Sequence, residues 1–178
     1  MRMAMTPAQV RAKSAAVIGR LNEAGNLATA RAILVYVSRG NEIETHGLIR
    51  DLLAQGREVA VPAFDADEKT YFASMVLDFE NDLEEAKMRI LEPRPYKLRR
   101  AEMDRFDVFL IPGLAFDRQG HRLGRGMGYF DAMLAGAVGT KIALAYDYQV
   151  IDEVPVKPHD VHMDFLVTET RVIACNRK

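Results

Sequence analysis

The sequence predicts a single three-layer α/β/α domain with a mostly parallel central sheet. The chain has 178 residues, a length that suits one domain with a sizeable core. Residues 32–38 form a continuous apolar run, of the kind that is buried on both faces of a parallel sheet. A helical pattern separates this run from a second strand-like run at residues 58–62, and such a strand–helix–strand unit places its two strands parallel.

The composition is that of an ordinary globular protein and argues against several classes of function. Lys and Arg number 24 against 25 Asp and Glu, and the net charge of −1 argues against general nucleic-acid binding. The single cysteine, Cys175, excludes an internal disulfide and fits a reducing compartment. No apolar run approaches the length of a membrane span, and no secretory signal is visible. We therefore expect a cytoplasmic protein that binds neither nucleic acid nor membranes.

The first half of the chain predicts two helices and three strands. Thr6 and Pro7 are typical of a helix start, and this helix is expected to run to about residue 22. Its basic residues favour a solvated face over a phosphate site. Thr45 is expected to cap a second helix, which Gly56 ends. The strands are expected at residues 32–38, 58–62 and 71–77.

Two charged segments follow in the middle of the chain. Residues 78–85 are acidic with a short helical pattern, and we expect them to be solvated. Glu92 precedes a proline and is expected in extended chain, where it either holds a loop or faces a nucleotide. Residues 94–105 are basic and predict a solvated loop, or alternatively a surface that attracts phosphates or an acidic tail.

The C-terminal part predicts three more strands, at residues 141–146, 165–168 and 171–174. Asp147 follows the first of them, on the side where ligands bind in open α/β sheets. The histidines show no metal-ligand spacing. Neighbours in sequence such as His159 and Asp160 rarely form a useful pair of base and orienting carboxylate.

Residues 106–134 carry the strongest functional signal. An apolar run leads into a glycine-rich basic loop and then into a helical pattern near Tyr129, which is the order in which a chain builds a phosphate site. Gly124, Gly126 and Gly128 allow positive φ and a close approach to a ligand. The spacing fits neither the Rossmann fingerprint nor a Walker A loop. Spacing alone leaves open both a phosphate site and a merely tight loop.

The charged residues of this loop favour the phosphate site. Arg122 and Arg125 offer charge-assisted donors that suit phosphate oxygens. Asp131 offers a hard oxygen ligand, which is the type that Mg²⁺ prefers.

Several segments resemble the 5-formyltetrahydrofolate cyclo-ligase family. Residues 112–117 match its pattern P-G-x-x-F-D, and residues 122–131 match R-x-G-x-G-x-G-Y-Y-D with Phe130 in place of the second tyrosine. Residues 42–45 resemble its E-[IV]-[DE]-T segment, and weaker likenesses extend the resemblance from Ala32 to Thr168. The resemblance implies one ribose-phosphate-isomerase-like domain over residues 1–178, without the additional first helix with which the family usually opens.

The resemblance also implies a reaction. The expected activity is the ATP- and Mg²⁺-dependent cyclisation of 5-formyltetrahydrofolate to 5,10-methenyltetrahydrofolate, with release of ADP and phosphate. The expected partners are therefore a reduced folate and ATP, and the chain is expected to act as a monomer.

Roles for individual residues follow from the same resemblance. Arg125 and Tyr129 are expected to be catalytic, and Asp131 and Asp160 to hold Mg²⁺. The folate is expected to contact Tyr71, Tyr129 and one glutamate of residues 42–45, with Glu44 preferred to Glu42. A carboxylate suits this task because it accepts two parallel N–H bonds from an aminopyrimidine edge. The nucleotide is expected to contact Arg122, Gly124, Arg125, Gly126, Met127, Gly128, Tyr129 and Asp131.

Three other functions stay open at this point. A diverged relative would act on another formyl or carboxyl compound. A binding protein would retain folate or nucleotide without turnover, although the presence of Arg122, Arg125 and Asp131 argues against it. A sugar-phosphate isomerase would share the architecture and need no ATP, but no clear carboxylate–lysine pair for that chemistry is visible.

Overall fold

The computed structural model describes residues 5–86, 91–126 and 128–176, and these form a mixed sheet of eight strands between helices. The strand order is β12-β11-β10-β7-β1-β2-β3-β6. The central strands run parallel: β11 (Phe165–Val167), β10 (Thr140–Leu144), β7 (Val108–Ile111), β1 (Ala32–Val35) and β2 (Glu58–Asp65). The strands β3 (Thr70–Val76), β6 (Arg100–Ala101) and β12 (Val172–Ala174) pair antiparallel with their neighbours, and β6 and β12 form the two edges of the sheet. The predicted mostly parallel sheet is confirmed.

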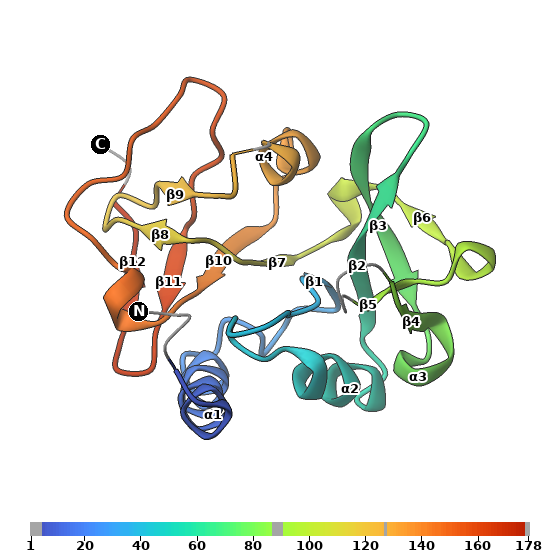
Figure 1. The fold of residues 1–178 in the computed structure, drawn as a ribbon, viewed down its shortest axis with the longest axis horizontal. Coiled ribbons are helices and arrows are strands. Elements are labelled where there is room, and N and C mark those ends of the chain that lie inside the picture. Colours follow the sequence, from blue (N-terminus) through green and yellow to red (C-terminus); the bar gives the residue numbers. More distant parts are fainter. Residues whose placement is uncertain (1–4, 87–90, 127, 177–178) are drawn as a thin grey trace.

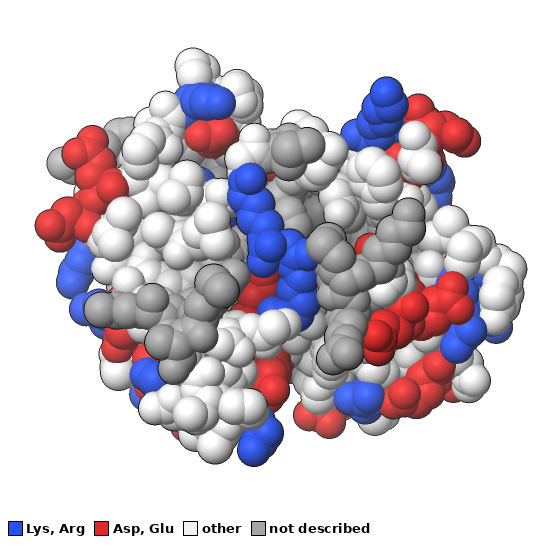
Figure 2. All heavy atoms as spheres, in the orientation of Figure 1, with Lys and Arg blue, Asp and Glu red and all other residues white. Residues whose placement is uncertain are grey.

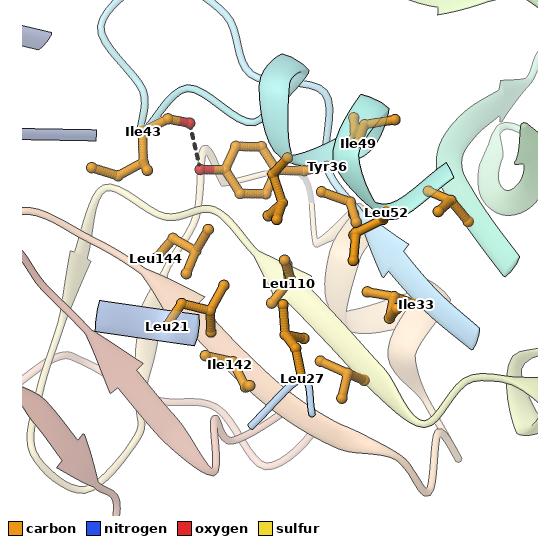
Figure 3. Close-up of a cluster of buried hydrophobic side chains, with 14 of the residues drawn as sticks. Leu21, Leu27, Ile33, Tyr36, Ile43, Ile49, Leu52, Leu110, Ile142 and Leu144 are labelled. Carbon is orange, nitrogen blue, oxygen red and sulfur yellow. Dashed lines mark hydrogen bonds between the residues drawn. The ribbon is translucent and has the colours of Figure 1, made fainter. Parts of the chain in front are cut away.

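Helices cover both faces of this sheet. In Figure 1, α1 (Pro7–Glu23) and α2 (His46–Ala54) lie on one face, and α4 (Tyr129–Leu134) lies on the other. Side chains alternate along β1, so Ile33 and Val35 join the hydrophobic cluster under α1 and α2, whereas Leu34 joins the cluster under α4. Figure 3 shows the first of these clusters. The sheet is therefore buried on both sides, which explains the continuous apolar runs.

The remaining elements are short. The helix α3 (Phe79–Asp82) precedes the ribbon of β4 (Leu83–Glu85) and β5 (Leu91–Pro93), and β8 (Ala115–Phe116) pairs with β9 (Arg122–Leu123). Short 3₁₀ helices span Pro95–Lys97, Met103–Arg105 and Asp147–Gln149. Within the ranges that the structure describes, each helix is too short or too polar to cross a bilayer.

The first helix begins as predicted. The Thr6 hydroxyl accepts a hydrogen bond from the Gln9 amide at 3.3 Å, and the Gln9 side chain accepts one from the Thr6 amide at 2.8 Å. This reciprocal capping box satisfies two backbone donors at the helix start. The predicted solvated basic face holds for Arg11, which is exposed. Lys13 and Arg20 are partly buried: Lys13 forms an ion pair with the Glu169 carboxylate, and Arg20 donates to the Glu169 carbonyl at 3.3 Å.

Thr45 is the N-cap residue of α2, as predicted, but its side chain makes no capping hydrogen bond. Its hydroxyl donates to the Tyr36 carbonyl at 2.6 Å and accepts from the Ser38 amide at 3.1 Å, so no side-chain bond remains for the helix start. The side chain is fully buried, and the backbone groups of the preceding loop compete successfully for it.

The acidic and basic middle segments pair with each other, which corrects the prediction that both are solvated. Asp82 is buried and accepts from the Leu77 amide and from Arg99 Nη1, both at 2.8 Å. Arg94 pairs with Glu84 at 2.9 Å. Tertiary folding brings the segments together, so their opposite charges neutralise each other locally. Glu92 lies in extended chain within β5, as predicted.

Candidate active site

The candidate site lies where the strand order reverses. From β1 the chain continues to β2 on one side, whereas from β7 it continues to β10 on the other. In open α/β sheets such a switch point leaves a crevice at the carboxyl ends of the strands, and ligands bind there. Figure 2 shows Lys and Arg side chains gathered at the centre of one face, between α4 and the region of β1 and β7.

The loop after β1 is held by long-range hydrogen bonds and turns one glutamate inward. The Tyr36 hydroxyl donates to the Ile43 carbonyl at 2.9 Å (Figure 3), and the Ser14 hydroxyl accepts from the Glu44 amide at 2.9 Å. The Tyr146 hydroxyl donates to the Glu42 carbonyl at 3.4 Å. As a result Glu42 is buried and Glu44 is exposed.

The Glu42 carboxylate joins the two halves of the site. Its Oε2 accepts from the Arg39 amide at 3.1 Å, and its Oε1 lies 3.3 Å from Nη2 of Arg125 in the loop after β7. The sequence motif allowed either Glu42 or Glu44 to face the ligand. In the structure Glu42 meets the glycine-rich loop, whereas Glu44, the residue preferred from the sequence, is exposed.

The loop after β7 begins with a hairpin that a buried carboxylate holds. Asp117 is fully buried and accepts from His121 Nδ1 at 2.7 Å and from the Val154 amide at 3.0 Å. Burial disfavours its charged form, but these hydrogen bonds outweigh burial and lower the pKa of Asp117. In the sequence, Asp117 was only the last residue of the family pattern P-G-x-x-F-D, and no role was predicted for it. Its role here is to fix the β8–β9 hairpin that carries Arg122.

The glycines of the loop act in two different ways. Gly126 has φ of 91° and Gly128 has φ of 66°, so the predicted positive φ is confirmed at both. Gly124 instead leaves space for the Arg122 side chain, because a Cβ at residue 124 would lie only 2.8 Å from Nη1 of Arg122. Met127 lies outside the described residues.

The two arginines of the loop differ in their surroundings. Arg122 is buried, and its Nη2 donates to Asp131 Oδ2 at 2.8 Å. Its Nε is buried with no hydrogen-bond partner among the residues that the structure describes. Arg125 is half exposed and meets Glu42. Arg122 is therefore a fixed donor, whereas Arg125 lies at the surface of the site.

The predicted metal ligands Asp131 and Asp160 are brought close by the backbone. Asp131 Oδ1 accepts from the amide of Val161, the residue after Asp160, at 3.2 Å. Asp160 Oδ2 accepts from the Lys157 amide at 2.8 Å. Over residues 5–86, 91–126 and 128–176, no group of three or more His, Cys, Asp or Glu is arranged to hold a metal. Protein sites often hold Mg²⁺ through one or two carboxylates with phosphates and water as the other ligands, so the two residues suit this ion by type. Both Asp131 oxygens already accept hydrogen bonds, Oδ2 from Arg122 and Oδ1 from Val161.

Aromatic side chains form one wall of the site. The ring centroids of Tyr71 and Tyr129 lie 5.4 Å apart, and Phe64 lies 5.3 Å from Tyr71 and 5.7 Å from Tyr129. Burial, together with the charge of Glu92, raises the pKa of Tyr71. The structure thus brings together the predicted Tyr71 and Tyr129. Sequence reasoning missed Phe64, although the β2–β3 pairing places it directly opposite Tyr71.

Two residues with potentially reactive side chains, His159 and Cys175, have no role in this site. His159 is exposed, and its Nε2 is 3.8 Å from Asp160 Oδ1, beyond hydrogen-bond distance. Cys175 packs half-buried, and burial raises the pKa of its thiol to about 12, so it stays protonated at neutral pH.

Comparison with known proteins identifies the family. A model of the 5-formyltetrahydrofolate cyclo-ligase family matches residues 1–169. The chain is 34% identical over 157 residues to a 5-formyltetrahydrofolate cyclo-ligase of Mycolicibacterium smegmatis, covering 84% of this chain and 79% of that protein. It is 26% identical to a protein of the same name from Escherichia coli, over 96% of each chain.

A solved structure supports the fold over nearly the whole chain. The NMR structure of 5,10-methenyltetrahydrofolate synthetase from Aquifex aeolicus superposes with a TM-score of 0.84 and 27% sequence identity. The match covers 97% of this chain and 86% of that one. The chain therefore belongs to the 5-formyltetrahydrofolate cyclo-ligase family.

Proposed function

We propose that the protein catalyses the ATP-dependent cyclisation of 5-formyltetrahydrofolate to 5,10-methenyltetrahydrofolate, with release of ADP and phosphate. One observation carries the proposal beyond family membership. The carboxylate suited to the pterin, Glu42, and the guanidinium suited to phosphate, Arg125, lie 3.3 Å apart. The two recognition groups therefore face one site, as the transfer of a phosphoryl group from ATP to a bound folate requires.

The chemistry explains why a phosphate clamp is required. The formamide carbon is a poor electrophile because the lone pair of its nitrogen deactivates it, and its oxygen is a poor leaving group. Transfer of the γ-phosphoryl group to the formyl oxygen forms an O–P bond, breaks the bond to ADP and corrects both defects. The neighbouring folate nitrogen then attacks the carbon and loses its proton, and phosphate leaves with the oxygen. Such catalysis depends mainly on positioning and charge neutralisation.

On the nucleotide side, we assign the phosphates to Arg122, Arg125 and the backbone amides of the glycine-rich loop. The Nε of Arg122, which has no partner among the described residues, supports this assignment, because a buried donor without an acceptor is costly unless a ligand satisfies it. Asp131 and Asp160 are the residues that would hold Mg²⁺. That ion, when bound, would neutralise charge on the transferred phosphoryl group.

On the folate side, we assign the pterin to Glu42 instead of Glu44. Glu42 is buried, and its carboxylate lies beside the phosphate loop, whereas Glu44 is exposed. Tyr71 and Tyr129 offer aromatic faces against which a pterin ring can stack. The aromatic wall and the carboxylate together suit a flat, amide-rich heterocycle.

The test is a direct assay with the purified protein, 5-formyltetrahydrofolate, Mg²⁺ and ATP. We expect the ultraviolet absorbance of the methenyl product to rise, with one ADP released for each product molecule, and no rise without ATP. Folate binding without product would instead indicate a diverged enzyme or a binding protein.

Glu42→Gln and Glu44→Gln then separate the two candidate glutamates. Glu42→Gln should weaken folate binding, and Glu44→Gln should not. The reverse result would mean that Glu44, and not Glu42, binds the pterin. The monomeric state and the cytoplasmic location stay predictions.

A further inference from the structure

The ion pair between Glu42 and Arg125 links two segments that are 83 residues apart in the chain. The Glu42 side chain is 10% exposed, and the Arg125 side chain is 51% exposed. The pair therefore spans the site from the loop after β1 to the loop after β7, and its arginine can turn toward solvent or toward a ligand.

We propose that Glu42 is a positioning residue for Arg125, which couples folate binding to nucleotide binding. In the ligand-free protein, Glu42 holds the guanidinium away from the phosphate position. When a pterin engages the carboxylate, Arg125 is released and turns to the phosphates. This inference rests on the proposed function, and it adds that each substrate increases the affinity for the other.

The geometry explains why both ligands compete with the pair. An aminopyrimidine edge presents two parallel N–H groups and needs both oxygens of a carboxylate. Oε1 of Glu42 faces Arg125, and Oε2 accepts from the Arg39 amide, so a pterin competes with both donors for the carboxylate. The guanidinium yields first, because it ends a side chain that is 51% exposed, whereas the Arg39 amide is fixed in the backbone. Phosphate oxygens likewise compete with the carboxylate for the same N–H groups of Arg125. Linkage then requires that the two affinities change by the same factor.

The other arginine of the loop provides a contrast. Arg122 pairs with Asp131 at 2.8 Å, and both partners belong to the segment that follows β7. Within the described residues, neither Arg122 nor Asp131 forms a hydrogen bond or ion pair with the loop after β1. Only the Glu42–Arg125 pair, among the ion pairs of the described residues, joins the two halves of the site.

The size of the coupling follows from the exposure of the pair. Ion pairs of which one partner is half exposed contribute little to binding or stability, because water screens them. We therefore expect loss of the pair to change nucleotide affinity by about two- to fivefold.

The experiment is a calorimetric titration with Mg²⁺ and a non-hydrolysable ATP analogue, in the absence of folate. Glu42→Gln should bind the analogue about two- to fivefold more tightly than the wild type, because Arg125 is no longer held. A merely structural role for Glu42 would weaken binding or leave it unchanged, and either result would overturn the inference. Asp51→Asn, on the exposed face of α2, is the control, since it removes the same charge elsewhere. Asp51→Asn should leave the affinity for the analogue unchanged. An equal gain in this variant would mean that the gain in Glu42→Gln comes only from the change in net charge, which would overturn the inference.

A second measurement needs no variant of Glu42. Saturating 5-formyltetrahydrofolate should tighten analogue binding to the wild type by about the same factor, and Arg125→Ala should abolish this gain. A gain that persists in Arg125→Ala would also overturn the inference. A wild type that binds no nucleotide would overturn the proposed function together with the coupling. A wild type that binds nucleotide with no effect of folate overturns the coupling alone.

Discussion

Replacing Asp117 with asparagine should lower the free energy of unfolding by about 2–4 kcal/mol at neutral pH. The carboxylate is fully buried, and four donors point at it. Oδ1 accepts from the amides of Gln119 and His121, both at 3.0 Å. Oδ2 accepts from His121 Nδ1 at 2.7 Å and from the Val154 amide at 3.0 Å.

The magnitude follows from what asparagine can accept. Its amide nitrogen only donates, so one of the two positions can no longer serve the donors that face it. If the nitrogen takes the Oδ2 position, His121 can change tautomer, but the buried Val154 amide loses its acceptor. If it takes the Oδ1 position, the amides of Gln119 and His121 lose theirs. At a mid-range cost of about 2 kcal/mol for each donor left unpaired, the loss of one or two gives about 2–4 kcal/mol.

The effect should also depend on pH in a definite direction. The folded-state pKa of Asp117 is lowered, because the hydrogen bonds outweigh the effect of burial. Stability from such a group is fully present above the unfolded-state pKa of about 3.9 and is lost as the pH falls through the folded-state pKa. The difference between wild type and Asp117→Asn should therefore shrink as the pH falls below about 4.

Urea unfolding at several pH values is the assay, and Asp152→Asn is the matched control because Asp152 is exposed nearby. The control should change stability by less than about 0.5 kcal/mol. If Asp117→Asn unfolds at the same urea concentration as the control, the hydrogen bonds to Asp117 do not hold the hairpin. Nucleotide affinity should fall with stability, because the same hairpin carries Arg122.

Three further variants test other parts of the structure. Asp131→Asn should lower Mg²⁺-dependent turnover by at least about tenfold while sparing the fold, since even residues that only support a metal ligand cost this much; an unchanged Mg²⁺ titration would remove Asp131 from the metal site. Arg125→Ala should raise the ATP concentration needed for half-maximal rate by about tenfold, given its half-exposed position; an unaltered ATP titration would exclude it from the phosphate clamp. Asp82→Ala should lower the free energy of unfolding in urea by about 2–3 kcal/mol, because the Leu77 amide and Arg99 lose their acceptor. An unchanged urea midpoint for Asp82→Ala would mean that solvent replaces these bonds.

Much of the fold could be predicted because its signals are local. Continuous apolar runs marked the strands that became β1, β7 and β10, and Thr6 followed by Pro7 marked the start of α1. The positive φ at Gly126 and Gly128 followed from the absence of a Cβ. The hairpin of β8 and β9 was missed, since two-residue strands leave no periodic pattern.

Predictions that depended on distant partners were less reliable. Asp82 lies in a segment that looks solvated, yet it is buried because Arg99 from beyond the β4–β5 ribbon supplies the opposite charge. Thr45 stands where an N-cap belongs, but its hydroxyl bonds to the carbonyl of Tyr36 instead. In both cases local preference was overridden by a partner that only the folded chain provides.

The sequence by itself determined the fold class, the family motifs and the residue types of the site. Only the tertiary structure decided which residues of these types face one another. The motif allowed either Glu42 or Glu44 and favoured Glu44, but the bonds from Tyr146 to the Glu42 carbonyl and from the Glu44 amide to Ser14 turn Glu42 toward Arg125. The physical reason is that motif spacing sets local chemistry, whereas the direction of a loop side chain depends on contacts with elements that are far away in sequence.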